Sequence, residues 1–358
     1  MNTSMDHLKR RNISLDFFRG IMSLLVCIGH FIYWNNINTI PVSFILCVDF
    51  FLVLSGFVLC HSVFIKMDKF DSIVFFKRRY LRLFPVYIFC VIITLPALIF
   101  LRHVPLPNLF DIFRILTISE MIPLNPRSNF PMLEPLGISY TISAELYVGV
   151  IFFPIISFIL NTYKQMLFPF LFILSIACIF ILNTTSISFM DAHHRLYNAF
   201  LDYSLIRCTL DYSIGAIAIL ILEKISNKPK EIYLTLIQIS CILLCIALYG
   251  HKSYNRNNEF LAPLIFMVLI ISLSFNSGKI FDITSNKIGI FLGNISYPVY
   301  LIHPLCISIT NEIILTTNIK LKITIYISIV VLFSYFINKY IEKPSLELIK
   351  NKYISSTK

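Results

Sequence analysis

Arg19 and His30 are ionisable residues inside an apolar run that extends from about Ser14 to Trp34. Their separation of eleven residues makes about three helical turns, so both side chains would share one stripe, about 16 Å apart along the axis. Ionisable groups within a membrane span cost about 2.5–3.5 kcal/mol each and usually mark functional sites. An imidazole there can take a proton from a hydroxyl group or carry an acyl group. The structural alternative pairs Arg19 with Asp16 and leaves His30 hydrogen-bonded within the bundle.

Two further charged features lie in the next apolar runs. Asp49, near the start of the second run, is expected at the depth of His30, where a carboxylate can orient an imidazole and stabilise its charged form. A basic cluster opens the third run, with three arginines at i, i+3 and i, i+4 spacings: Arg78, Arg79 and Arg82. Because guanidinium groups bind phosphate with paired hydrogen bonds, this cluster predicts a phosphate site. The alternative, strongest for Arg78 and Lys77, is a positively charged anchor that sets the topology.

The elements that position these residues follow from composition. Hydrophobic residues make up 57% of the 358 residues, charged residues make up 14%, and the mean hydropathy is +0.79. A soluble domain carries about 25% charged residues, whereas here apolar runs of roughly 20 residues, enough to cross a bilayer, separate short charged clusters. These runs are too long and continuous for barrel strands, so we expect an all-α bundle of transmembrane helices. Ten spans are predicted, at 14–34, 43–65, 82–101, 144–160, 166–183, 207–223, 232–250, 259–275, 288–312 and 321–340.

The distribution of basic residues predicts the orientation. With a cytoplasmic N-terminus, the inside segments hold 20 Lys and Arg and the outside loops hold 9, while Arg19 within the first span completes the 30. This asymmetry follows the positive-inside rule, with both termini cytoplasmic. Topology therefore accounts for much of the net charge of +11, and no nucleic-acid partner is expected.

The remaining polar features are expected to be structural. The nine cysteines lie mostly within apolar runs, which argues against a disulfide framework, and no metal site is expected. Arg207 and Asp211, at i, i+4, are predicted to form an ion pair. The loop 193–195 is expected to be solvated on the outer side. The connection 102–143 contains six prolines and is expected to be irregular or to hold short re-entrant pieces.

Six short motifs follow one another along the chain, the first being Leu15-Asp16-Phe17-Phe18-Arg19-Gly20 with His30 eleven residues after Arg19. The later motifs are Asp49-Phe50-Phe51 to Ser55-Gly56-Phe57, Arg79-x-x-Arg82, Ser143-Ala144-Glu145-Leu146-Tyr147, Ile295-Ser296-Tyr297-Pro298-Val299-Tyr300-Leu301-Ile302-His303-Pro304 and Glu342-Lys343-Pro344. In this order, the chain resembles the acyltransferase 3 family of bacterial membrane O-acyltransferases. One departure is Tyr140, which stands where the family commonly has Trp.

The resemblance implies one acyltransferase 3-like transmembrane domain over residues 1–345, with a short cytoplasmic tail over 346–358 and no fused soluble domain. It also implies acyl-CoA as the donor, taken from the cytoplasm. The expected donor-binding residues are Arg19, Arg78, Arg79 and Arg82. The expected catalytic residues are His30, Asp49, Glu145 and His303, all at a similar depth, although His303 also suits a structural hydrogen bond between helices.

The resulting hypothesis is transfer of an acyl group, taken to be acetyl from acetyl-CoA, to a hydroxyl of a cell-envelope polysaccharide or its lipid-linked precursor. Lipopolysaccharide O-antigen is the first such acceptor implied, and the expected location is the bacterial inner membrane among membrane lipid. His30 would act as general base or as transient acyl carrier. The alternatives are a transporter or flippase of a lipid-linked sugar and a glycan polymerase or ligase. The sequence does not indicate an oligomeric state.

Overall fold

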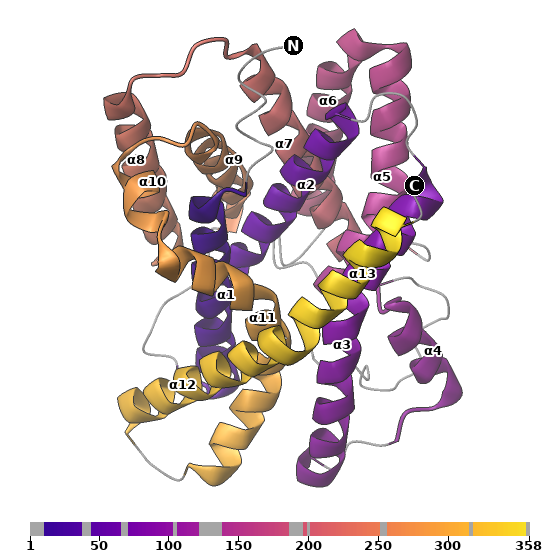
Figure 1. The fold of residues 1–358 in the computed structure, drawn as a ribbon, viewed down its shortest axis with the longest axis vertical. Coiled ribbons are helices and arrows are strands. Elements are labelled where there is room, and N and C mark those ends of the chain that lie inside the picture. The colour runs from indigo at the N-terminus through magenta and orange to yellow at the C-terminus, as the bar shows by residue number, and fades with distance from the viewer. Residues whose placement is uncertain are drawn as a thin grey trace.

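The computed structural model describes residues 11–37, 44–65, 71–102, 106–121, 138–185, 196–198, 201–250, 256–314 and 318–355. Within these ranges, nine helices are long and apolar enough to cross a membrane, and a further apolar helix over Asn258–Ser274 is shorter. The helices form one bundle (Figure 1). Each of the ten predicted spans falls on one of these helices, which confirms the prediction of an all-α transmembrane bundle.

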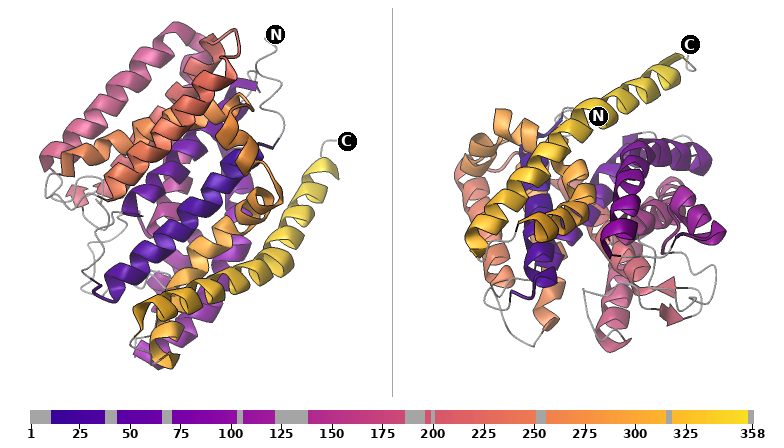
Figure 2. Two further views of the ribbon diagram at one scale, coloured as in Figure 1. Left: turned by 90° about the vertical axis from the view of Figure 1, so that its left-hand side faces the viewer. Right: turned by 90° about the horizontal axis from the view of Figure 1, so that it is seen from below.

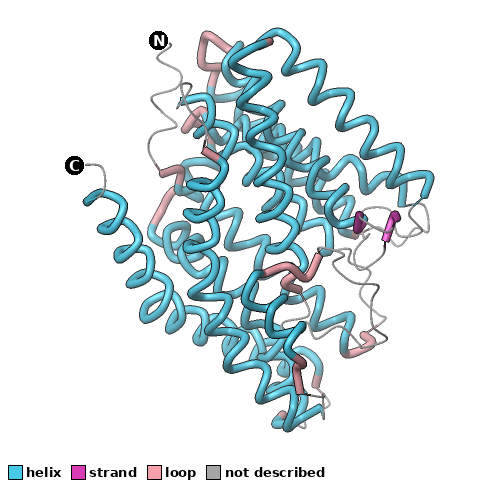
Figure 3. The backbone as a smooth tube through the Cα atoms, turned by 90° about the vertical axis from the view of Figure 1, so that its right-hand side faces the viewer, coloured by secondary structure: helices cyan, strands magenta, loops and turns pink. Residues whose placement is uncertain are grey.

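The helices follow the chain in this order: α1 (Ile13–Trp34), η2 (Phe44–Leu46), α2 (Cys47–Ile65), α3 (Ser72–Arg102), α4 (Leu109–Thr117), α5 (Tyr140–Thr162), η3 (Lys164–Met166), α6 (Leu167–Thr185), α7 (Tyr203–Lys224), α8 (Glu231–Tyr249), η5 (Arg256–Phe260), α9 (Leu261–Ser274), α10 (Lys279–Thr284), α11 (Lys287–Ile313), α12 (Ile319–Ile337), the π-helix η6 (Asn338–Glu342) and α13 (Lys343–Ser355). Two short strands, β1 (Leu196–Asn198) and β2 (Leu201–Asp202), pair antiparallel before α7 (Figure 3).

Glycines allow two helix pairs to pack very closely. α1 lies along α11, and α2 lies along α7 (Figure 1). A Cβ atom at Gly20 would lie 2.4 Å from the Cβ of Leu292, and one at Gly215 would lie 2.2 Å from the carbonyl oxygen of Val53. Small residues at such contacts let the backbones of transmembrane helices approach each other. Close packing therefore holds α1 directly against α11 and α2 directly against α7.

Helix α3 begins ten residues before the predicted span at 82–101. The Asp71 side chain caps its first turn by accepting hydrogen bonds from the backbone N–H groups of Ile73 and Val74, at 2.8 and 3.1 Å. The basic cluster therefore lies within the first three turns of a helix rather than at its end. This placement turns part of the cluster toward the interior of the bundle.

The described part of the 102–143 connection returns into the bundle. α4 is followed by a buried stretch, Ser119 to Met121, that lies between α3 and α5. Tyr147 of α5 donates a hydrogen bond to the carbonyl of Thr117 at 2.9 Å, and Ser143 of α5 accepts one from the backbone N–H of Met121 at 3.1 Å. The segment is therefore held by α5 as well as by α3.

The C-terminal helices run on from one another without a break. Figure 2 shows α12, η6 and α13 as one nearly continuous helix that crosses the bundle and projects beyond it. At the π-turn, Asn338 donates hydrogen bonds to the carbonyl of Asn294 at 2.7 Å and to Glu342 at 2.8 Å. A side-chain contact of this kind accounts for a local change of helix pitch. The turn fixes Glu342 beside α11.

Candidate functional site

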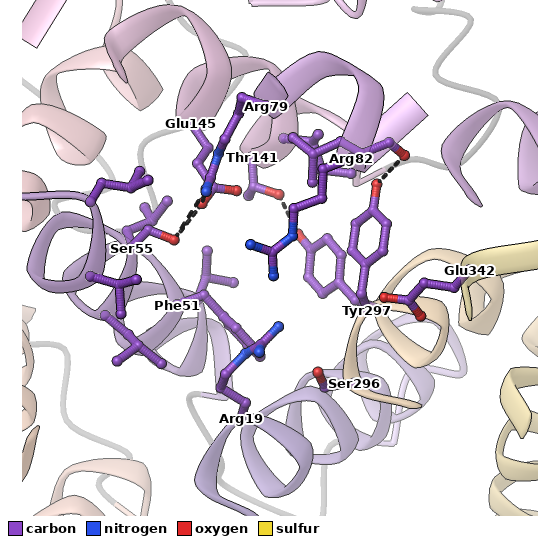
Figure 4. Close-up of a pocket in the computed structure, with 18 residues that line it drawn as sticks. Arg19, Phe51, Ser55, Arg79, Arg82, Thr141, Glu145, Ser296, Tyr297 and Glu342 are labelled. Atoms are coloured by element: carbon purple, nitrogen blue, oxygen red, sulfur yellow. Dashed lines mark hydrogen bonds and ion pairs between the residues drawn. The ribbon is translucent and has the colours of Figure 1, made fainter. Parts of the chain in front are cut away.

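A cavity of about 170 Å³ lies between α1, α2, α3, α5, α11 and η6. Arginine side chains extend into it from α1 and α3 (Figure 4). Its polar lining consists of Arg19, Ser55, Arg79, Arg82, Thr141, Glu145, Ser296, Tyr297, Tyr300 and Glu342. We call this space the arginine cavity. It is lined by three of the four arginines that the sequence predicts to bind the donor.

Arg79 and Glu145 form an ion pair in the wall of the arginine cavity, and Ser55 also donates a hydrogen bond to the Glu145 carboxylate. The Tyr212 hydroxyl donates to the backbone carbonyl of Glu145 at 3.0 Å. Glu145 was expected at the depth of His30, but it lies beside the arginines instead. Its carboxylate fixes the Arg79 side chain and offsets its charge.

Arg82 and Arg19 present guanidinium groups to the interior of the arginine cavity (Figure 4). Among the described residues, Arg82 forms no ion pair within 4 Å. Arg19 lies 3.4 Å from Asp16, but that carboxylate is shared with Arg11. Glu342 is the second carboxylate of the cavity lining. The cavity thus holds three arginines against two carboxylates, which suits an anionic ligand.

A second cavity, of about 360 Å³, adjoins the first at Leu59, Arg79 and Arg82. It is bounded by the C-terminal part of α2, the first turns of α3 and Ser157 of α5. Arg78 lines this second cavity only. All three predicted arginines of α3 therefore lie along two neighbouring cavities, as a site for an elongated anion requires.

His30 and His303 face each other at the other end of this region. His30 Nδ1 lies 2.7 Å from His303 Nε2. His303 Nδ1 faces the backbone carbonyls of Tyr300 at 2.8 Å and Val299 at 3.3 Å. Because carbonyl oxygens only accept hydrogen bonds, His303 Nδ1 carries the proton and Nε2 of the neutral ring is an acceptor. His30 Nδ1 must then donate to it, so the neutral His30 ring has its lone pair on Nε2.

Tyr300 connects the arginine cavity to the two histidines. It lines the cavity, and its ring centroid lies 6.1 Å from that of His303 and 6.2 Å from that of Phe51. Its hydroxyl forms a hydrogen bond with Thr141 at 2.7 Å. The sequence prediction overlooked Tyr300, although its position three residues before His303 places both side chains on one helix face. Tyr300 therefore forms an aromatic wall between the cavity and the His303 ring, and Phe51 packs beside it as part of the cavity lining.

Asp49 does not orient His30, contrary to the sequence prediction. Its buried carboxylate accepts two hydrogen bonds from Arg207, at 2.6 Å from Nε and 2.9 Å from Nη2. The Asp49 side chain is 0% exposed and that of Arg207 is 2% exposed. The prediction that Arg207 pairs with Asp211 along α7 is also wrong, because Arg207 reaches across to α2. A buried guanidinium needs a bidentate partner, and Asp49 supplies it.

The nine cysteines are free and buried. Within the described ranges, no group of three or more His, Cys, Asp or Glu side chains could hold a metal ion. The loop 193–195 lies outside the described residues.

Membrane-length helices surround an arginine-lined cavity and a histidine pair, so fold and site define a multi-pass membrane protein with a polar site inside its bundle. A family model described as an acyltransferase domain matches residues 12–339. The chain therefore belongs to the acyltransferase 3 family and is a membrane acyltransferase. A search of curated proteins and a search of solved structures each gave no significant match.

Proposed function

We propose that the protein transfers an acetyl group from acetyl-CoA to a hydroxyl of a cell-envelope polysaccharide or its lipid-linked precursor, such as lipopolysaccharide O-antigen, in the bacterial inner membrane. One observation carries the proposal. A cavity lined by arginines lies one aromatic wall away from a histidine pair in which the neutral His30 ring has a lone pair on Nε2. An anionic donor and a general base are the two requirements of this reaction.

The charges of the two adjoining cavities suit the proposed donor. Acetyl-CoA is an anionic nucleotide on a long arm that ends in a thioester. The second cavity, with Arg78, and the arginine cavity, with Arg82 and Arg19, provide guanidinium groups for its phosphates. The arm would then point toward the wall of Phe51 and Tyr300.

His30 would activate the acceptor. Its Nε2 takes the proton of the acceptor hydroxyl while the oxygen attacks the thioester carbonyl. The carbon–sulfur bond then breaks, and the CoA thiolate takes the proton back from the imidazolium. In the alternative route, His30 Nε2 attacks the thioester carbonyl and CoA leaves as the thiolate, after which the hydroxyl oxygen takes the acetyl group from Nε2 and the thiolate takes the hydroxyl proton. Both routes need the tautomer that His303 imposes by accepting a hydrogen bond from Nδ1.

Sealed membrane vesicles test the proposal. With both termini cytoplasmic, as the distribution of basic residues predicts, the α3 arginines face the cytoplasm and His30 lies in the outer half. Inverted vesicles given labelled acetyl-CoA outside are therefore expected to acetylate a lumenal glycan, whereas right-side-out vesicles are expected to remain unlabelled. The readout is base-labile label in the extracted glycan.

Vesicles carrying His30→Gln serve as the control for transfer by other proteins, and a protected lumenal marker confirms sealing. Equal labelling in both orientations would refute transfer across the membrane. No wild-type labelling above the His30→Gln background, even after permeabilisation, would refute acetyl transfer from acetyl-CoA to that glycan.

Arg82→Lys is expected to raise the KM for acetyl-CoA by about tenfold, since a point charge replaces a planar fork that binds phosphate with two hydrogen bonds. Steady-state kinetics with purified protein measure this change. Lys77→Gln is the matched control, because Lys77 is exposed on the same helix and lines neither cavity. A wild-type KM in Arg82→Lys would leave Arg82 as a topology anchor only.

A further inference from the structure

Trp34 is the last residue of α1 and lies about one helical turn beyond His30. Its ring is nearly parallel to that of His30, with an interplanar angle of 9° and centroids 5.1 Å apart. It also lies near the ring of His303, at 6.5 Å and 17°. These separations fall within the range of offset-stacked aromatic pairs, about 4.5–7 Å. His30 thus contacts an indole ring while it is hydrogen-bonded to His303.

The indole ring distinguishes between the two charge states of His30. The face of an aromatic ring carries negative electrostatic potential, and tryptophan attracts a cation within about 6 Å of its centroid more strongly than the other aromatic side chains do. A neutral imidazole gains only ordinary stacking from this contact. An imidazolium gains the additional attraction, which is stronger where water is largely excluded.

We propose that Trp34 stabilises the imidazolium that His30 forms during transfer and is therefore a positioning residue for the reaction. The inference rests on the proposed function, in which His30 Nε2 takes the hydroxyl proton. Trp34 itself transfers neither a proton nor the acetyl group. It acts through His30, as His303 does by accepting the hydrogen bond from Nδ1. The sequence contains one tryptophan, so this contact also provides a specific optical signal.

Among the residues that the structure describes, few other groups near His30 titrate in the same range. Within the described ranges, the titratable side chains on this part of α1 and on the elements packed against it include Cys27, Cys47, Asp49, Tyr300, His303, Cys306 and Tyr326. The negative charge of Asp49 is matched by Arg207. Cysteine and tyrosine side chains ordinarily titrate above the range in which histidine does. A transition near neutral pH at this stack therefore reports on His30 or His303.

Tryptophan fluorescence of the purified full-length protein in lipid nanodiscs tests the stack without donor or acceptor. A protonated imidazole quenches indole emission, so emission from Trp34 is expected to fall as pH is lowered from about 9 to about 5. The transition is expected to disappear in His30→Gln and to persist in His303→Gln. A signal that does not change with pH, or one that is lost in His303→Gln but kept in His30→Gln, would overturn the inference.

The pH dependence of kcat tests the effect on catalysis. Trp34→Leu is expected to move the midpoint of the acidic limb of the kcat–pH profile downward by about half to one pH unit, and Trp34→Phe by less. The matched control is Tyr33→Leu, which removes a 77% exposed ring from the same helix end and should leave the limb unchanged.

The transfer assay and the fluorescence titration distinguish a failure of the proposed function from a failure of this inference. Absence of wild-type transfer refutes the function, while the fluorescence titration still tests the contact between Trp34 and a protonated His30. A Trp34→Leu or Trp34→Phe variant with lower kcat but an unmoved acidic limb would mean that Trp34 only packs, and it would overturn the inference.

Discussion

His30→Gln is expected to lower kcat for acetyl transfer by about 10²–10⁴-fold, the range that a general base usually contributes. Glutamine is polar and of similar length, but it cannot take a proton from a hydroxyl group or carry an acyl group. The geometry makes this loss specific to one nitrogen, because His30 Nδ1 donates a hydrogen bond to His303 Nε2, 2.7 Å away, and this leaves the basic lone pair of His30 on Nε2. Acetylation of the glycan, normalised to the amount of folded protein in the membrane, measures the effect.

His61→Gln is the matched control, since His61 lies on α2, is partly buried and lines neither cavity. It is expected to retain wild-type kcat. His303→Gln should cause a smaller loss than His30→Gln, because it disturbs the tautomer and orientation of the base without removing it. Wild-type turnover in His30→Gln at normal abundance would exclude His30 from the chemistry.

Arg207→Leu is expected to destabilise the folded protein by about 3–5 kcal/mol, the usual penalty for leaving one partner of a buried ion pair uncompensated. The variant would leave Asp49 buried next to Asp211, which also lies within the interior and within electrostatic reach of Asp49. Asp49→Asn is expected to cost less, since Arg207 would still lie near the Asp211 carboxylate. Thermal unfolding in detergent and the yield of monodisperse protein measure both changes.

The Arg207→Leu variant combined with Asp49→Leu provides the control. Replacing both partners by apolar side chains removes the unpaired charge, so stability should recover in part. A catalytic role for Asp49 predicts a different pattern, namely normal amounts of folded Asp49→Asn protein that cannot transfer acetyl groups. That result would reverse the assignment of Asp49 to the structural contact between α2 and α7.

Hydropathy was sufficient to predict the bundle because the bilayer sets helix length and excludes other architectures. The least distinct predicted span, 207–223, belongs to α7, whose membrane-length window is 78% buried, the largest such fraction among the described spans. A helix surrounded by other helices can carry polar groups that a lipid-facing one cannot, as the buried Arg207 and Asp211 of α7 show. The start of α3 was misplaced for a related reason, because its arginines face interior cavities instead of marking a helix end.

The candidate site was predictable in its residue types and only partly in its contacts. Sequence position gives the depth of a residue along its helix, which brought His30 and His303 to the same level. It does not give the direction in which the side chain points relative to neighbouring helices. Asp49 shows this limit, since its carboxylate faces α7 and binds Arg207. Glu145 likewise faces Arg79 of α3.

The histidine pair joins residues that are 273 positions apart in the chain. During synthesis, α1 enters the membrane early, while α11 leaves the ribosome only after most of the polypeptide has been made. His30 therefore lies in the bilayer without its hydrogen-bond partner His303 until α11 inserts. Because the tautomer of His30 depends on His303, a nascent or truncated chain that ends before α11 lacks the arranged base. In this way the order of helix insertion delays competence for the reaction until the protein is nearly complete.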